Sequence, residues 1–462
     1  MTRPATRRTW IFVALLVALT LAALPRNAHA IPAFARRYRT TCASCHTAAP
    51  KLNAVGEAFR LNGYRLREFD EALGRDAGLP LGDEGWRDLW PDGIWPGEIP
   101  SGPPISLRVQ ADVVSIPRGR PDAGLHFRFP RDVYLLSGAS LGDGLAGFIE
   151  MEGNAEEGVR VLQARLTFTQ LFRRIPRGAL QLTVGRTNPF LFSFADRQID
   201  RAAIMPFGWQ GYRVADLRLS TASGADTIAS LNRARIGGLG AGFELHGFLG
   251  GRFAYGVGVL QGADPSQSDN NNHKDVYARV RYKWGGLRLD GTYEDGGRPP
   301  VGSGGQRWDR SLILEAFAYG GEEPATSARA DRYLASGLNL RWLNGPLDLG
   351  VGTVVRRDDD PWGIGQAAEM RSHFAKGEYY VWPWFAFSAK AEAFRARSAG
   401  ARRAGYVRGA EDQLRFAPGV IALIRQNVRF AAEADMRGRD ASIADAGLRR
   451  GTAVTVRLDV AY

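Results

Sequence analysis

Both cysteines of the 462-residue chain lie in one short stretch, Cys42-Ala43-Ser44-Cys45-His46. C-x-x-C-H is the attachment pattern of c-type haem, in which two thiolates add across the vinyl groups on one porphyrin edge. The histidine that follows directly is then held beneath the iron as an axial ligand. A redox dithiol is the alternative, but such motifs usually begin a helix in a βαβ unit, and no such context surrounds residues 42–46. The sequence predicts one covalent haem c on Cys42 and Cys45, with His46 as axial ligand.

The composition narrows the other possibilities. Hydrophobic residues make up 45% of the chain and 56 residues are glycine, which excludes a disordered chain and suits turn-rich β-structure. Two cysteines exclude a disulfide-built fold and any four-cysteine zinc or iron–sulfur site. The formal net charge is +12, but no arginine cluster stands apart as a nucleic-acid patch, so we expect no nucleic-acid partner.

Residues 1–30 have the three parts of a secretory signal peptide. The start is basic, residues 11–24 are apolar, and Ala28-His29-Ala30 is a small-x-small cleavage site. The alternative is a membrane anchor, but an apolar run of about 14 residues is shorter than the roughly 20 that span a bilayer. We expect these residues to be removed after export, which is also a condition for attaching haem c.

Residues 31–104 are predicted to form a small α-helical cytochrome domain followed by a linker. A helix opened by Pro50 and closed by Asn62-Gly63 fits the three- and four-residue spacing of the apolar positions between them. Trp, Pro and Gly residues then lead to Pro104, as expected for a lid and linker.

The second axial ligand is missing from this domain. No Met and no His occurs in 47–104. The sixth position of the iron must therefore be filled from elsewhere, held by another residue type or by water, or left open. The candidates are Met205, His126 and Met151. Met205 lies in the long irregular segment 187–212, which could fold inward.

From residue 105 to 462 the hydrophobic period is two. Apolar and polar residues alternate through 105–113, 162–169, 276–284 and 428–435. The last such segment ends on Tyr462, as the assembly signal of outer-membrane barrels does. Alternation in segments of about ten residues predicts an all-β transmembrane barrel of about 16–18 antiparallel strands. We place this barrel in the bacterial outer membrane, in contact with lipid.

Short turns and long loops are expected to alternate along the barrel. Turns are predicted at 285–286, 344–346 and 425–427, and long polar loops near 264–274, 296–309, 358–373 and 397–412. The alternation of short turns and long loops breaks between 295 and 333, so the predicted number of strands in that part is wrong by one.

A family resemblance adds to this interpretation. Phe34-Ala35-Arg36, the C-x-x-C-H motif, Pro50-x-Leu52, Gly56-x-x-Phe59 and Asn62-Gly63-Tyr64, followed by a barrel, resemble the fused outer-membrane cytochrome–porins. The best-known members are the iron oxidases of iron-oxidising bacteria. The resemblance implies a monohaem N-terminal domain that plugs the lumen or its periplasmic mouth. It also implies the thioether roles of Cys42 and Cys45 and the axial role of His46.

One haem in a barrel suggests movement of single electrons across the outer membrane. We expect Fe(II) oxidation at the cell surface, with electrons passed to a soluble periplasmic c-type cytochrome, the activity of an iron:cytochrome c oxidoreductase. One alternative is a conduit for another extracellular donor or for outward flow. Another is a substrate porin whose haem domain is a sensor or regulated plug. A haem peroxidase fits poorly, because no distal acid–base histidine is evident near the motif.

Charge in the lumen is the remaining clue. Seven inward-parity cations face four carboxylates: Arg108, Arg165, Arg279, Arg281, Lys283, Arg429 and Arg457 against Asp112, Glu433, Asp435 and Asp459. A basic lumen disfavours entry of a dication, so we expect electrons to be taken at the outer mouth or from anionic iron chelates. The run Asp358-Asp359-Asp360 is either an external Fe(II) site with hard oxygen ligands or, more simply, a solvated loop.

Overall fold

The protein is described by a computed structural model. Its described residues are 34, 40–64, 79–80, 98–99, 105–116, 123–140, 144–154, 158–193, 204, 206–207, 212–217, 219, 230–232, 234–262, 271–297, 308–406, 410–425, 427–438 and 451–461. No helix among them is long and apolar enough to cross a membrane.

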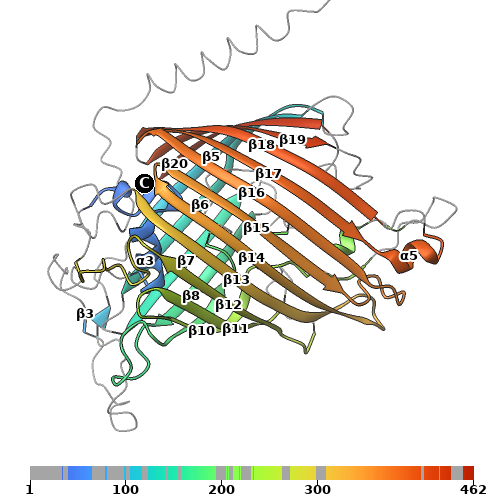
Figure 1. Ribbon diagram of the computed structural model, residues 1–462, viewed down its shortest axis with the longest axis horizontal. Coiled ribbons are helices and arrows are strands. Elements are labelled where there is room, and N and C mark those ends of the chain that lie inside the picture. Colours follow the sequence, from blue (N-terminus) through green and yellow to red (C-terminus); the bar gives the residue numbers. More distant parts are fainter. Residues whose placement is uncertain are drawn as a thin grey trace, which may run out of the picture.

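The main body is a closed antiparallel barrel of sixteen strands (Figure 1). The strands are β5 (Ile105–Ile116), β6 (Gly124–Ser140), β7 (Leu145–Asn154), β8 (Gly158–Phe168), β9 (Gln181–Thr187), β10 (Gly240–Leu249), β11 (Phe253–Leu260), β12 (Asp275–Trp284), β13 (Asp309–Pro324), β14 (Ala330–Gly345), β15 (Leu347–Asp358), β16 (Ala368–Trp382), β17 (Phe385–Arg397), β18 (Ala410–Arg425), β19 (Val428–Gly438) and β20 (Gly451–Ala461). The last strand, β20, pairs with the first, β5, and this seam closes the ring.

The expected fold class of the barrel is confirmed. The predicted turns at 344–346 and 425–427 join β14 to β15 and β18 to β19. The break in alternation has a simple cause: β12 and β13 are consecutive neighbours in the barrel, and the long connection between them, 285–308, lies at the short-turn end.

The two faces of each strand match the alternation of the sequence. In β12, Val276 and Val280 are exposed on the outer face, whereas Arg279 and Lys283 are buried on the inner face. Outward-facing tryptophans that are each about half exposed collect at one end of the barrel: Trp284, Trp342, Trp382 and Trp384. An aromatic girdle beside an apolar band is typical of a barrel that sits in a bilayer.

The girdle lies at the end where the turns are shortest. Residues 250–252 and 346 form complete connections there, whereas residues 188–239 connect β9 to β10 at the opposite end. Outer-membrane barrels have short periplasmic turns and longer extracellular loops. The short-turn end is therefore periplasmic, and the helix α5 (Ala399–Arg403) lies at the extracellular end (Figure 1).

The 188–239 connection folds into the lumen. Its described apolar residues form one core with the inner faces of β11 to β17 and the loop after β15; they include Phe192, Ile204, Phe207, Tyr212 and Ile236. The Phe192 ring lies 5.0 Å from Phe317 of β13 and 5.4 Å from Phe207. The expectation that this segment could fold inward is confirmed for its described residues.

A second piece of chain, residues 40–64, lies inside the periplasmic end of the barrel, and we call it the plug. It contains a short 3-10 turn η1 (Cys42–Ser44), the strands β1 (His46–Ala48) and β2 (Lys51–Leu52), and the helix α3 (Ala54–Leu61) (Figure 1). Of residues 1–39 and 65–104, the structure describes residue 34 and two short paired strands, β3 (Leu79–Pro80) and β4 (Glu98–Ile99).

The plug helix begins later than the sequence predicted. Pro50 lies between β1 and β2, and the N-cap is Asn53, whose Oδ1 accepts from the Gly56 backbone N–H at 3.0 Å. An asparagine oxygen in this position satisfies one of the amides that the first helical turn leaves unpaired. The predicted end at Asn62-Gly63 is confirmed, and Gly63 has the positive φ of +70° that favours glycine.

Candidate functional site

The C-x-x-C-H residues form a tight turn that is fixed from behind by Asn53. The Cys45 N–H donates to the Cys42 carbonyl at 3.2 Å, which brings the two cysteines to one side of η1. The Asn53 amide donates to the carbonyls of Ala43 and Ser44 at 3.1 and 3.2 Å. One buried side chain therefore joins the turn to the start of α3. The sequence analysis did not identify this role of Asn53.

Cys42, Cys45 and His46 all line one cavity of about 200 Å³ between the plug and the barrel wall. Its walls are largely apolar and carry the rings of Phe34, Phe59, Tyr64 and Phe148. The Tyr64 ring stacks on Phe34 and on Phe148 of β7, with centroids 5.5 and 4.8 Å apart.

Close packing behind the motif keeps the cavity on one side of it. A Cβ at Gly56 would lie 2.1 Å from the Cys45 carbonyl oxygen, so only glycine lets α3 approach the turn this closely. At Gly138 of β6, a Cβ would lie 2.7 Å from the Phe34 ring. Both glycines line the cavity.

His46 has the hydrogen bond expected of an axial ligand. Its Nδ1 lies 3.3 Å from the Lys51 carbonyl oxygen. A carbonyl can only accept, so this bond places the proton on Nδ1 and leaves the lone pair on Nε2 for a metal. A backbone carbonyl on the second ring nitrogen is the usual way to orient a ligating histidine.

The two thiols are unlike those of a redox dithiol. Burial raises the pKa of Cys42, and burial together with the neighbouring Cys42 raises the pKa of Cys45 to about 12. Redox C-x-x-C motifs instead lower the pKa of the attacking thiol to keep it ionised near neutral pH. The apolar surroundings disfavour the dithiol alternative. They suit cysteines whose thiols have reacted before the plug is buried.

Charged contacts fix the plug to the far wall of the barrel. The Lys51 ammonium forms buried ion pairs with Asp348 of β15 and, at 2.5 Å, with Glu378 of β16. These carboxylates outweigh the effect of burial, which alone would lower the pKa of Lys51, and the net result is a raised pKa. A charge buried without such partners costs several kcal/mol, so this pairing specifies how the plug is seated.

Glu57 of α3 is the opposite case, an acid among cations. It pairs with Arg60 at 2.8 Å and lies 3.5 Å from Arg281 of β12. Burial alone would raise the pKa of Glu57, but the two arginines outweigh it and lower the pKa to about 2. The plug is thus held to opposite parts of the wall by charges of both signs.

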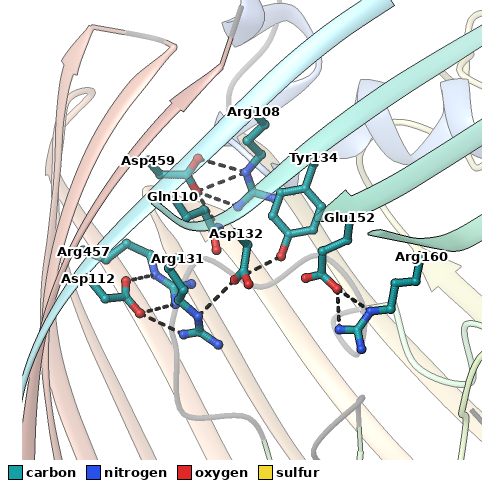
Figure 2. Close-up of polar contacts among 10 residues, drawn as sticks. All are labelled: Arg108, Gln110, Asp112, Arg131, Asp132, Tyr134, Glu152, Arg160, Arg457 and Asp459. Atoms are coloured by element: carbon teal, nitrogen blue, oxygen red, sulfur yellow. Dashed lines mark hydrogen bonds and ion pairs between the residues drawn. The ribbon is translucent and has the colours of Figure 1, made fainter. Parts of the chain in front are cut away.

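The other side of the cavity is built by the barrel seam. Arg108 at the start of β5, Arg429 at the start of β19 and Asp459 near the end of β20 all line it. Arg108 Nε donates to Asp459 Oδ1 at 2.9 Å, and Arg429 Nη2 donates to Asp459 Oδ2 at 2.8 Å. Figure 2 shows Arg108 and Asp459 at one edge of a wider set of lumen ion pairs.

The three sixth-ligand candidates are not brought to this cavity by the described structure. His126 lies near the extracellular end of β6, eleven residues before the cavity residue Ser137. At roughly 3.3 Å per strand residue, that is more than 30 Å. Met151 alternates with the buried Glu150 and Glu152, so it faces outward toward lipid. Met205 lies outside the described residues.

The described residues that line the cavity include no Met and no His besides His46. Among the residues that the structure describes, no group of three or more His, Cys, Asp and Glu is arranged to hold a metal ion.

The prediction of a basic lumen needs correction. The cations do face inward, but carboxylates of other strands pair with them: Arg279 with Glu244, Arg281 with Glu315, Lys283 with Asp309, and Arg457 with Asp112. Glu244 lies two strands away from Arg279, whereas Glu315 and Asp309 lie on the strand next to their partners. These three acids were not among the four that the sequence suggested. The wall is a lattice of ion pairs and gives no argument against a dication.

The acidic run 358–360 is also structural. Asp358 is buried and pairs with Arg356 at 2.5 Å, while Asp360 Oδ1 accepts from the N–H groups of Ile364 and Gly365 at 2.7 and 2.8 Å. Asp358 and Asp360 thus shape the loop between β15 and β16, whereas Asp359 is exposed.

Comparison with known proteins identifies the fold. No family model and no curated protein matches the chain. Among solved structures, it is similar to a loop-deletion mutant of OmpT, an outer membrane protein of Vibrio cholerae (11% identity, TM-score 0.51, 78% of this chain and 99% of that chain). It is also similar to an anion-selective porin from Comamonas acidovorans (13%, 0.50, 78% and 99%) and to OprB of Pseudomonas putida (9%, 0.50, 78% and 94%). At these identities the likeness shows the fold alone, that of a bacterial outer-membrane barrel.

Proposed function

We propose that the plug carries one covalent haem c and that the protein transfers single electrons across the outer membrane. The observation that carries this proposal is the cavity at the periplasmic mouth. Cys42, Cys45 and His46 line it together, its walls are apolar, and the His46 Nδ1–H is bound to a backbone carbonyl. Both sulfurs and the nitrogen lone pair that haem c requires are therefore available in one space.

Each residue has a defined part in holding this group. Cys42 and Cys45 supply the thioether bonds, and His46 Nε2 supplies the axial ligand. Asn53 keeps the turn in shape, and the Lys51 carbonyl keeps the imidazole in the ligating tautomer. The aromatic walls exclude water and so influence the potential of whatever the cavity holds. When bound, haem c supplies a one-electron Fe(III)/Fe(II) couple.

The position of the cavity limits where an electron donor can react. The plug occupies the periplasmic end, and a donor held at the outer surface would be separated from it by roughly the 30 Å of a bilayer core. We therefore propose that a small reductant enters the barrel from outside. This revises the expectation that electrons are taken at the outer mouth.

Fe(II) is the donor that we propose, because it gives up one electron at a time and needs no second centre. Each Fe(II) would lose one electron to form Fe(III), and each electron would reduce one oxidised c-type cytochrome in the periplasm. With these partners the protein would be an iron:cytochrome c oxidoreductase. With another donor it would remain an electron-transfer protein of the same construction.

A porin is the second candidate function. It is favoured by the barrel itself, which is similar to solved porins, one of them titled anion-selective. It is also favoured by the inward-folded 188–239 connection, whose described apolar residues pack on one part of the wall, from β11 to β17. In this alternative the plug would regulate passage of solutes, and the lumen would conduct ions whether or not electrons move.

Liposomes that contain oxidised cytochrome c test the proposal. Purified protein is inserted, and Fe(II) or Fe(II)–citrate is added outside. We expect reduction of the internal cytochrome at a rate proportional to inserted protein, and no reduction with Cys45→Ala. Ion conductance without cytochrome reduction would favour the porin. Reduction by another extracellular donor but not by iron would keep the conduit and remove Fe(II) as its donor.

A further inference from the structure

The barrel seam contributes a binding site of its own to the cavity. We propose that Arg108 and Arg429, positioned by Asp459, bind the two propionate carboxylates of the haem, an inference that rests on the proposed function. The barrel would then complete the site that the plug begins, and the group would bridge the two parts of the protein.

The charge of the cavity matches this assignment. The charged side chains that line it, apart from His46, are three arginines and one carboxylate: Arg60, Arg108, Arg429 and Asp459. Arg60 is paired with Glu57, so the seam supplies two positive charges from Arg108 and Arg429 and one negative charge from Asp459, a net positive site. A haem carries two propionate carboxylates, one for each of these arginines. Arginine guanidinium groups form strong paired hydrogen bonds with carboxylates, and these bonds gain strength where water is excluded.

The placement of the arginines matches as well. Thioether bonds form on one edge of the macrocycle, and the propionates leave it on the side away from that edge. In the cavity the cysteines lie on the plug, whereas Arg108 and Arg429 come from β5 and β19 of the opposing wall. A haem attached through the plug therefore turns its acidic edge toward the seam.

Asp459 has the contacts of a positioning residue. Its carboxylate binds Arg108 through Nε and Nη2, Arg429 through Nη2 and Gln110 through Nε2 at 3.1 Å. It thereby fixes two guanidinium groups that would otherwise repel each other. A guanidinium has five N–H donors, so one bound carboxylate does not exhaust its capacity for a second.

The seam also offers a matched control. Arg457 of β20 lies two residues from Asp459, faces the lumen and pairs with Asp112 at 2.6 Å (Figure 2). Its side chain is 14% exposed, against 16% for Arg108, but it does not line the cavity. Without Arg108, Asp459 still pairs with Arg429, and without Arg457, Asp112 still pairs with Arg131. The two substitutions therefore disturb the barrel similarly.

The test is a redox titration of purified full-length protein across pH 6–9 for Arg108→Gln, Arg429→Gln and Arg457→Gln. Covalent haem is measured separately in denaturing gels, and barrel folding is measured by migration of unheated samples. Loss of a cation near the iron favours the oxidised state, so both cavity variants should have a lower midpoint potential. A propionate without its arginine should also titrate within this range, so that the potential falls as pH rises. Wild type and Arg457→Gln should show neither change.

Substitution by lysine separates charge from packing. Arg108→Lys and Arg429→Lys keep the positive charge and should restore most of the potential. Normal haem content with unchanged potentials in both glutamine variants would overturn the propionate site and leave the proposed function standing. A wild-type protein without covalent haem would overturn both.

Discussion

Two segments occupy the lumen of this barrel, and they are held there in different ways. The described apolar side chains of the 188–239 connection pack against the inner faces of β11 to β17. The plug is fixed both by charged contacts and by small apolar clusters around Ala48 and Leu61, and it leaves an apolar cavity beside the C-x-x-C-H motif. A segment that only narrows the lumen can bury all of its apolar side chains. An apolar space beside two cysteines and a histidine is what the proposed haem requires.

The thiols of the plug give the largest expected difference. In protein made without haem attachment, the raised pKa of Cys45, about 12 against an ordinary value of 9.0, leaves roughly a thousandfold less thiolate at neutral pH. Alkylation of Cys45 by iodoacetamide at pH 8 should therefore be about a thousandfold slower in the folded barrel than in urea. Equal rates would mean that the plug does not bury this thiol in the haem-free protein.

The inward connection should respond to loss of packing. Phe192→Ala removes a fully buried ring from the core with Phe207 and Phe317 and should cost roughly 3–5 kcal/mol of unfolding free energy in urea. It should leave haem content unchanged. Phe172→Ala is the control, because that ring is 60% exposed, and it should have little effect. Haem loss with Phe192→Ala would contradict the separation of the two segments.

The plug should respond to loss of charge. Lys51→Ala leaves Asp348 and Glu378 buried without the Lys51 cation. Breaking a buried ion pair costs roughly 3–5 kcal/mol, and we expect the lower end of this range because Arg341 still binds Asp348 at 2.7 Å. A cost of about 3 kcal/mol raises the undocked population roughly a hundredfold. Proteinase K should then digest the plug faster from the periplasmic side, whereas Lys274→Ala on an exposed loop should not change the rate. Unchanged digestion would show that the plug is seated by other contacts.

Acid should weaken the same docking to a smaller extent. The pKa of Glu57 is lowered to about 2, so its ion pairs stabilise docking fully above the unfolded value near 4.5 and are lost as pH falls toward 2. Plug digestion by pepsin should accelerate over that window in wild type. Glu57→Gln should be more susceptible already at pH 5 and should lack this part of the pH dependence. An identical pH profile in the variant would exclude Glu57 as the acid-sensitive group.

Local patterns predicted much of this molecule. The alternation in 276–284 predicted both the strand and which face of it meets lipid, because side chains on a strand have a period of two. The C-x-x-C-H motif predicted the cysteines and histidine that share the cavity. The irregular stretch after β9 was expected to be able to fold inward, and its described residues do.

The remainder depends on residues that only the closed ring brings together. Arg108 and Asp459 are 351 positions apart and meet because β5 and β20 form the seam. Lys51 and Asp348 are 297 positions apart and meet because the plug enters the barrel. No local spacing contains such pairs. Asp348 was therefore missing when the lumen was taken as basic, and Asp459 was counted without its partner. The start of α3 was misplaced because Pro50 is compatible with a first helical turn, whereas the cap was supplied by Asn53.

The central claim is that the plug holds one covalent haem at the periplasmic mouth of the barrel. Intact-protein mass spectrometry of the chain purified from outer membranes, followed by peptide mapping of residues 40–64, tests it most directly. We predict the mass of one haem per chain, retained after denaturation, on the peptide that contains Cys42 and Cys45, and no retained haem mass with Cys45→Ala and Cys42→Ala combined. A wild-type chain of unmodified mass with two free thiols would contradict the account.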